Sequence, residues 1–161
     1  MRGGALPPAL LAAALGLALA FARSRDRRTG LWLFAAIAVA ASHVPWPRPW
    51  LDGVFIACWT GVVAGAASVH LPRLLRCAVA LPLAVNAGIW AGGVIALAGA
   101  PSDLIKALPW VLLALPAARL ADTPAAIALK VAASWLIAVA ALAALLPFLP
   151  VTPGYLPDHL D

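Results

Sequence analysis

Four polar side chains at or beyond the ends of the apolar segments belong to types that can do chemistry: His43, Asp52, Asp158 and His159. Imidazole and carboxylate groups together can bind a divalent metal or move protons at a lipid headgroup. These four residues come from separate parts of the chain, and no spacing in the sequence brings them together. They define the alternative function, a membrane-embedded enzyme that acts on a lipid headgroup at the outer face.

The motifs of common catalytic and cofactor sites do not occur in the sequence. It has no GxxxxGK[ST] phosphate loop, no GxGxxG, no HExxH and no GxSxG. Cys58 and Cys77 have no metal-binding spacing and are expected to be small packing residues. We therefore predict no metal and no cofactor, and we expect a role other than catalysis.

Asn86 is the one strongly polar side chain near the middle of an apolar segment. Its amide needs a hydrogen-bond partner in hydrocarbon. Two interpretations stay open: a bond to another helix, worth about 0.6 kcal/mol on average, or a contact with a solute or ion. Because the chain has no glutamate and no mid-segment carboxylate, a proton-coupled pump is disfavoured, whereas a facilitator for small solutes is not.

The composition explains why so few polar residues are available. The chain has 161 residues, of which 65% are hydrophobic and 11% charged, and its mean hydropathy is +1.00. Soluble domains carry roughly 25% charged residues, and a small one buries only about two-thirds of its surface. Lipid must therefore be the solvent for most of the chain. We predict an all-α, polytopic membrane helix bundle that forms a single transmembrane domain over residues 1–161.

Six apolar segments are candidates for membrane spans. A helix that crosses the bilayer core needs about 20 apolar residues. The second and fifth candidates are short, and Pro109 and Pro116 interrupt the fifth, so it is either a broken or a re-entrant helix. A total of four or five spans is the alternative. The six segments are approximately 5–22, 30–45, 51–71, 74–100, 103–120 and 124–149.

The basic residues predict the orientation. With six spans, three of the eleven basic residues fall on one side of the membrane and eight on the other. Positive charge stays in the cytoplasm, so both termini are expected outside an inner (plasma) membrane. An excess of arginine over lysine, nine to two, is typical of a GC-rich bacterial genome. We assign the net charge of +5 to orientation and expect no nucleic acid partner. The eight on the inner side are Arg23, Arg25, Arg27, Arg28, Arg73, Arg76, Arg119 and Lys130.

Two interface features follow from this orientation. Arg23, Arg25, Arg27 and Arg28 either bind anionic lipid or an acidic partner, or only fix the topology. The stretch SHVPWPRPW, residues 42–50, is expected to be the first outward turn, with Trp46 and Trp50 anchored at headgroup depth. Its alternative is a rigid aromatic platform for a ligand or a proline-reading partner.

Small residues recur every fourth position in the third and fourth segments. Close backbone approach holds helices together in lipid, so we predict that these two helices are neighbours or that one stripe makes a homo-oligomer contact. The expected function is transporter-like, or that of a packing subunit in a membrane complex. The expected partners are membrane lipids, a second copy or other subunits. The stripes are Ala57, Gly61 and Gly65 in the third segment, and Ala84, Gly88, Gly92 and Ala96 in the fourth.

Overall fold

The structure is a computed structural model that describes residues 4–148, and all its regular elements over that range are helical. The predicted all-α class is confirmed. Within these residues, three helices are long and apolar enough to cross a membrane, at Arg48–Ser68, Arg73–Ala98 and Ala126–Leu145. The elements are α1 (Leu6–Ala20), α2 (Ser24–Ser42), η1 (Arg48–Trp50), α3 (Leu51–Ser68), α4 (Arg73–Ala98), α5 (Pro101–Ala107), η2 (Leu108–Leu113), α6 (Ala114–Leu120), α7 (Ala126–Leu145) and η3 (Leu146–Phe148).

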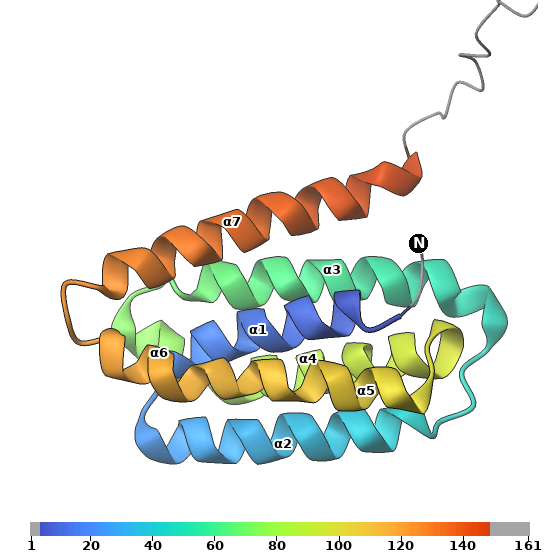
Figure 1. Ribbon diagram of the computed structural model, residues 1–161, viewed down its shortest axis with the longest axis horizontal. Helices are drawn as coiled ribbons and strands as arrows, with labels where there is room; N and C mark the ends of the chain where they lie inside the picture. The colour runs from blue at the N-terminus through green and yellow to red at the C-terminus, as the bar shows by residue number, and fades with distance from the viewer. Residues whose placement is uncertain (1–3, 149–161) are drawn as a thin grey trace, which may run out of the picture.

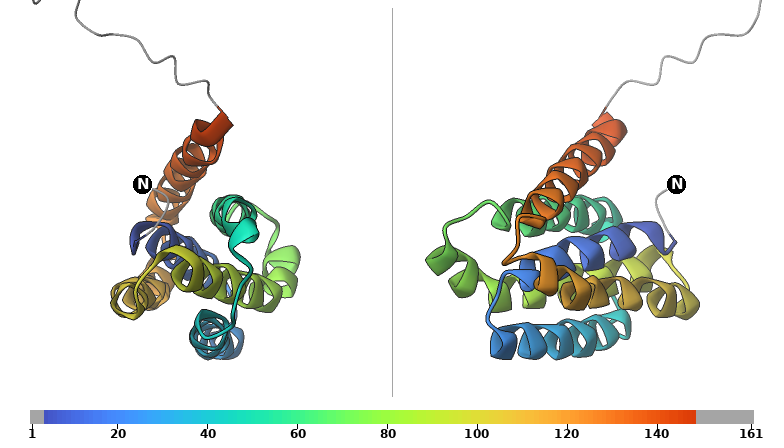
Figure 2. Two further views of the ribbon diagram at one scale, coloured as in Figure 1. Left: turned by 90° about the vertical axis from the view of Figure 1, so that its right-hand side faces the viewer. Right: turned by 60° about the vertical axis from the view of Figure 1, so that its left-hand side comes forward.

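The central element is α1, which the other helices surround (Figures 1 and 2). Every residue from Leu11 to Ala20 is buried, and the helix contacts α3, α4, η2 and α6. A helix that is apolar around its whole circumference is stable only when it is covered on all sides. The uninterrupted Leu and Ala sequence of this helix therefore fits its place in the core.

The helix α2 differs from the short second segment expected at 30–45. It begins at Ser24, so Arg25, Arg27 and Arg28 lie in its first turns and not in a loop. Arginine is a good helix former, and Asp26 in the first turn interacts favourably with the helix dipole. The nineteen residues of α2 reach about 28 Å, which is close to the thickness of a bilayer core.

The fifth segment forms a broken helical rod. The elements α5, η2 and α6 follow one another in one direction along the bundle (Figure 1). Pro109 lies at the start of η2, whose six residues form a 3-10 helix. This break packs on Gly16 of α1, where an added Cβ would lie 3.0 Å from the Val111 carbonyl oxygen. Protein thus covers the altered backbone, which is the condition for a broken helix in lipid.

The glycines of α4 face α2. A Cβ added at Gly92 would lie 2.5 Å from the Ala38 carbonyl oxygen, and one added at Gly88 would lie 2.8 Å from the Ile37 Cβ. Ala84 is buried in the same contact region, whereas Ala96 is exposed. The two helices therefore approach so closely that only glycine fits between them.

The small residues of α3 face a different helix. A Cβ added at Gly65 would lie 3.4 Å from the Ala14 Cβ, and one added at Gly61 would lie 3.0 Å from a Leu11 methyl group, both on α1. Ala57 is half-buried. The helices α3 and α4 are neighbours, but their two stripes do not face each other. The four-residue spacing identifies a small face on each helix and does not identify the helix that covers it.

The helix α7 packs mainly on α3 and leans away from the other helices toward its C-terminal end (Figures 1 and 2). It begins at Ala126, two residues later than expected, because the Thr123 hydroxyl donates to the Leu120 carbonyl at the end of α6. Large apolar side chains such as Trp135 and Leu142 remain exposed along it. Lipid, and not protein, would solvate much of this helix.

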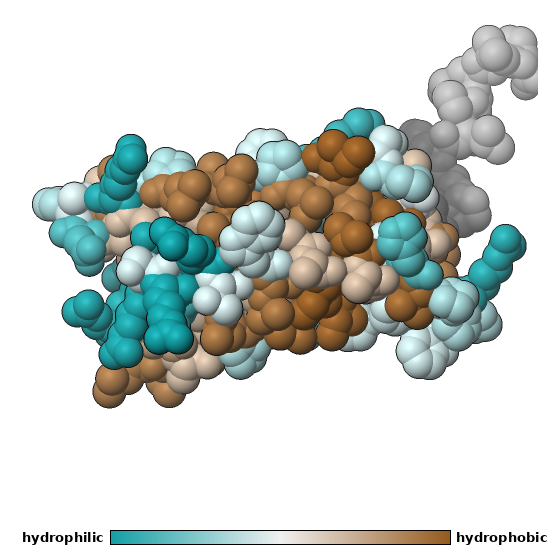
Figure 3. Space-filling model, turned by 90° about the horizontal axis from the view of Figure 1, so that it is seen from below, coloured by the Kyte–Doolittle hydropathy of each residue, from teal (hydrophilic) through white to brown (hydrophobic). Residues whose placement is uncertain are grey.

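The surface is divided into an apolar middle and polar ends. On the face that Figure 3 shows, hydrophobic side chains occupy the middle of the molecule. Hydrophilic side chains gather most densely at the end where α1 joins α2. This pattern is that of a helix bundle placed across a bilayer.

Candidate functional site

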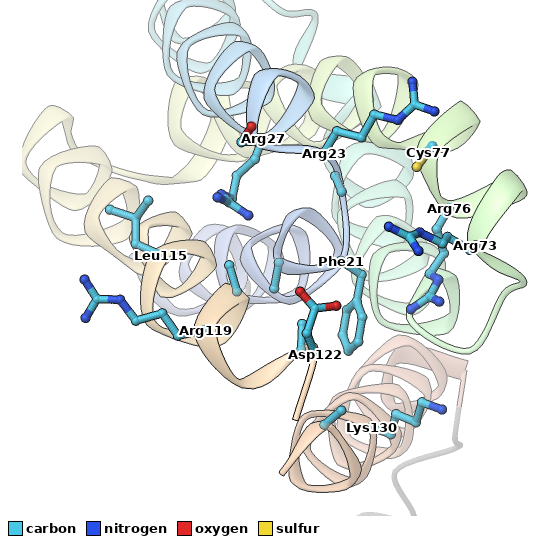
Figure 4. A pocket seen from close by; sticks show the side chains of 16 residues that line it. Phe21, Arg23, Arg27, Arg73, Arg76, Cys77, Leu115, Arg119, Asp122 and Lys130 are labelled. Carbon is cyan, nitrogen blue, oxygen red and sulfur yellow. The ribbon is translucent and has the colours of Figure 1, made fainter. Parts of the chain in front are cut away.

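A pocket of about 780 Å³ lies at the end of the bundle where α1 joins α2, α3 joins α4 and α6 joins α7 (Figure 4). One acidic residue, Asp122, lines it. Apolar residues that include Phe21 and Leu115 form the rest of its wall. The basic residues of the wall are Arg23, Arg27, Arg73, Arg76, Arg119 and Lys130. We refer to this cavity as the arginine pocket.

Four helical elements bring these basic side chains together. Arg27 lies in the first turns of α2, and Arg73 and Arg76 lie one turn apart at the start of α4. Arg119 belongs to the last turn of α6 and Lys130 to the beginning of α7. Because residues three apart share one face of a helix, Arg73 and Arg76 reach the same cavity.

Helix ends of both signs lie at the arginine pocket. The helices α2, α4 and α7 begin there, whereas α1 and α6 end there. The first turn of α4 contains no acidic residue. A helix N-terminus carries a partial positive charge, so Arg73 and Arg76 add to that of α4 and do not compensate it. An anion bound beside them would interact favourably with the arginines and with the dipole of α4.

Arg76 has an unused hydrogen-bond donor in this pocket. Its guanidinium carbon lies 4.8 Å from the centroid of the Phe21 ring, a cation–π contact. Its Nε is shielded from solvent and has no acceptor within residues 4–148. A buried donor without a partner costs about 1–3 kcal/mol.

The charges of the arginine pocket are not neutralised by the protein. Over residues 4–148, the structure has no ion pair between any of its six basic side chains and a carboxylate, whereas Lys106 and Asp103 pair at 3.6 Å near the opposite end. The guanidinium group presents a planar fork of N–H donors that matches two oxygens of a phosphate. The arrangement is therefore chemically suited to hold a multiply charged oxyanion.

Two of the four predicted histidine and aspartate residues lie in the described part of the chain. His43 caps the C-terminus of α2 and is exposed, and Asp52 is exposed in the first turn of α3. Asp158 and His159 lie outside the described residues. Between residues 4 and 148 no group of three or more His, Cys, Asp or Glu side chains could hold a metal ion.

The two tryptophans of the SHVPWPRPW turn have different surroundings. The indole N–H of Trp46 donates to the Ala41 carbonyl at 2.9 Å, and its ring lies 6.3 Å from those of Trp50 and Trp90. This ring also packs on Gly93 of α4. Trp46 therefore ties the turn to the bundle, whereas Trp50, 58% exposed, has the accessibility that an interface anchor needs.

Asn86 lies on the outside of the bundle and not in its centre, which α1 occupies. It is exposed in a groove of about 680 Å³ between α3 and α4. Within residues 4–148 its amide makes no hydrogen bond with the protein. Small residues, among them Ala57, Gly61 and Ala64, form much of the groove. A solute path through the interior would not meet this side chain.

The sequence analysis assigned Arg73, Arg76, Arg119 and Lys130 to orientation alone. The sequence places these four residues on the same predicted side of the membrane. Because loops on one side of a short bundle are close in space, this common side could have indicated a shared cavity. Six of those eight basic residues line the arginine pocket, and Arg25 and Arg28 do not. No family model, curated protein or solved structure in our comparisons matches this chain, so the geometry carries the functional argument.

Proposed function

We propose that this chain is a six-span bacterial inner-membrane protein that binds a phosphate-bearing anion in the arginine pocket, at its cytoplasmic end. One observation carries this proposal: six basic side chains from four helical elements surround one cavity and find no carboxylate partner within the described residues. A cluster of this kind repels itself unless an anion or solvent offsets the charge. Binding of a phosphate-bearing anion is the function that suits such a cluster.

The six-span topology is supported by the number of helical rods and by the positions of the basic residues. Six helical rods lie along the bundle: α1, α2, α3, α4, the broken rod of α5, η2 and α6, and α7 (Figure 1). The broken rod reaches about 33 Å, because each 3-10 residue rises about 2.0 Å where an α-helical one rises 1.5 Å. Positive charge stays in the cytoplasm, which places the arginine pocket inside and both termini outside.

The topology has its own test. A reporter active only in the cytoplasm is fused after Asp122, at the end that carries the pocket, and in a second protein after Asp161. We expect activity from the first fusion and none from the second. Activity after Asp161 would contradict the proposed orientation.

Ligand binding is tested with inorganic pyrophosphate as the probe. The full chain is purified in an uncharged detergent and titrated by calorimetry, as wild type, Arg76→Gln and Arg28→Gln. Arg28 is the matched control, because it belongs to the same basic set but does not line the pocket. We expect Arg76→Gln to weaken binding about tenfold, the effect of losing roughly 1.4 kcal/mol from a charge-assisted hydrogen bond.

Two results would contradict the pyrophosphate proposal. One is a wild-type protein that does not bind pyrophosphate at millimolar concentration. The other is an equal loss of affinity in Arg76→Gln and Arg28→Gln, which would indicate general charge attraction and no site. Measuring pyrophosphate affinity at low and at high salt separates general charge attraction from binding at a site. Long-range attraction is screened over about 10 Å at 0.1 M ionic strength, whereas contacts within a site are screened less.

A second candidate function, that of a packing subunit, is favoured by the groove between α3 and α4. Its small residues allow a helix to approach closely, and the Asn86 amide would gain a partner there. Cysteine cross-linking tests it, with Cys58 and Cys77 replaced by Ala. We expect Ala64→Cys in the groove to link two copies and exposed Ile127→Cys on α7 not to. Equal linking, or none, would remove this candidate.

The enzyme alternative has no comparable support. Asp158 and His159, two of its four residues, lie outside the described part of the chain, and His43 and Asp52 are not gathered around a cavity that they share. We therefore do not propose catalysis at the outer face.

A further inference from the structure

A second cavity lies beside the arginine pocket, further along the bundle. It is a crevice of about 750 Å³ between α1, the broken rod and α7, and its walls are almost entirely apolar. Representative residues of its walls are Leu10 and Leu17 of α1, Trp110 and Leu113 of η2, and Ala132 and Leu136 of α7. We refer to this cavity as the apolar crevice.

The arginine pocket and the apolar crevice are lined by neighbouring stretches of the same three elements. On α1, Leu17 lines the crevice and Ala20 lines the pocket one turn later. On α7, Ala132 lines the crevice and Lys130, two residues earlier, lines the pocket. On the broken rod, Leu113 lines the crevice and Leu115 the pocket. The two cavities share no lining residue but lie next to each other along the bundle, so a ligand that spanned both would meet a cationic end and an apolar length.

The apolar crevice is accessible from the surface of the bundle, because Leu6, Trp110 and Trp135 of its walls are 66%, 51% and 70% exposed. The helix α7, which forms one wall, leans away from the other helices toward its C-terminal end (Figures 1 and 2). An opening on a lipid-facing side admits a molecule that is already dissolved in the bilayer. A soluble anion would reach the arginine pocket from water and would leave the crevice unused.

The dimensions of the apolar crevice fit one acyl chain. From Leu6 to Leu17 the wall on α1 rises about 17 Å at 1.5 Å per residue. One leaflet of a roughly 30 Å core is about 15 Å thick. Lys106 is the only basic residue that lines the far end, and Asp103 already pairs with it, so the unpaired arginines determine which end attracts an anionic headgroup.

We propose that the ligand is an anionic phospholipid of the inner leaflet, with its phosphate among the arginines and one acyl chain in the apolar crevice. This inference rests on the proposed function and names the ligand class for the same site. The cationic end recognises the phosphate by bidentate hydrogen bonds, and the apolar length separates a lipid from a soluble phosphate compound. A helix from another protein is the competing occupant of the crevice.

The experiment compares lipid and soluble probes on the same protein. The full chain in detergent is mixed with phosphatidylglycerol or with phosphatidylcholine of the same chain length, and bound lipid is counted by native mass spectrometry. Pyrophosphate binding is measured in parallel. We expect phosphatidylglycerol to be bound about tenfold more tightly than phosphatidylcholine, because both present the same phosphate but the choline cation of phosphatidylcholine is repelled by the arginines.

A matched pair of variants separates the apolar crevice from the arginine pocket. Ala132→Phe fills the crevice, whereas Ala138→Phe places the same ring on another exposed face of α7. We expect Ala132→Phe to lose the bound phosphatidylglycerol and to keep pyrophosphate binding, and Ala138→Phe to keep both. Arg76→Gln is expected to weaken both. A lipid with a photoactivatable acyl chain should cross-link to Leu10–Leu17, Trp110–Leu113 or Ala132–Leu136 in the wild type. This measurement uses the wild-type protein alone, so it does not depend on whether a variant folds.

Three results would overturn the lipid assignment: equal binding of the two lipids, full lipid retention in Ala132→Phe, or cross-links spread over the surface with none in the apolar crevice. If pyrophosphate still binds and Arg76→Gln still weakens it, only the lipid assignment fails. If pyrophosphate binding is also absent, the proposed function fails with it. Co-purification of a helical partner protein whose cross-links map to the crevice would replace the lipid with that partner.

Discussion

The pair α2–α4 and the helix α7 associate with the bundle in opposite ways. At the α2–α4 contact the backbones touch: an added Cβ at Gly92 would lie 2.5 Å from the Ala38 carbonyl oxygen. Along α7, in contrast, Trp135 and Leu142 remain exposed, and a 750 Å³ crevice separates part of the helix from α1. One contact is closed to any third molecule and the other leaves room for one.

The difference teaches what holds each helix in place. Lipid tails are as apolar as leucine, so burying leucine against protein gains little in a membrane, and close van der Waals packing decides which helices associate. The glycine face of α4 provides such packing. The exposed face of α7 is rich in large side chains instead, so it remains solvated by lipid, and an acyl chain can occupy the crevice beside it.

The largest predicted effect comes from a substitution that disrupts the close contact between α2 and α4. Gly92→Ile inserts four carbons where even one does not fit, so we expect a loss of folded protein, or a destabilisation beyond the 1–3 kcal/mol typical of overpacking. Folded yield and thermal midpoint in detergent measure it. Gly53→Ile is the control, because nothing lies within 4 Å of a Cβ added there. Equal stability of the two variants would mean that α2 and α4 do not pack as described.

A smaller effect is expected when the stability cost of Leu→Ala at the centre of the bundle is compared with that on α7. Leu15→Ala leaves a cavity in the centre of the bundle and should cost about 2 kcal/mol, the lower end of the range for soluble cores, because the transfer of leucine into lipid is nearly neutral. Leu142→Ala, at a position 61% exposed, should cost less than about 0.5 kcal/mol. Unfolding in a denaturing detergent series measures both. Equal costs would place α7 inside a protein interface.

Trp46→Phe tests how the turn extends the closed contact. The substitution removes the hydrogen bond to the Ala41 carbonyl but keeps a ring against Gly93, so we expect a loss of about 1 kcal/mol. Trp50→Phe, at an exposed ring without that bond, should change stability by less than half as much. Thermal unfolding of both variants in one detergent measures the difference. A larger effect for Trp50→Phe would reverse the roles assigned to the two rings.

The sequence predicted the features that depend on composition and periodicity. The apolar excess required helices in lipid, and the prolines of the fifth segment required a break, which η2 provides. The four-residue stripes identified Gly61, Gly65, Gly88 and Gly92 as contact positions, and each of them is buried. These properties depend on local composition and residue spacing, so they can be predicted from a single sequence.

The features that depend on three-dimensional arrangement could not be predicted in this way. Nothing in the periodicity indicates that α1 lies in the centre, that Gly92 faces α2, or that Asn86 lies on the outer surface. The arginine pocket is an intermediate case. The charge alternation placed Arg76, Arg119 and Lys130 on one side, and only the packing of α4, α6 and α7 brings them to one cavity.

The smallest predicted effect concerns the groove between α3 and α4. Its packing is intermediate between the close α2–α4 contact and the loosely packed α7. Asn86 makes no hydrogen bond within the described residues, so Asn86→Leu removes no contact from a single copy and relieves an unpaired amide in lipid. We expect the stability of a monomer, measured at high detergent dilution, to change by no more than about 0.5 kcal/mol or to rise. In a self-associating protein the same substitution should weaken association by about 0.6 kcal/mol or more, because an interhelical hydrogen bond is lost. A loss above about 1 kcal/mol in the monomer would show that the amide bonds inside the bundle, and the groove would then be part of the closed core and not a surface for a second copy.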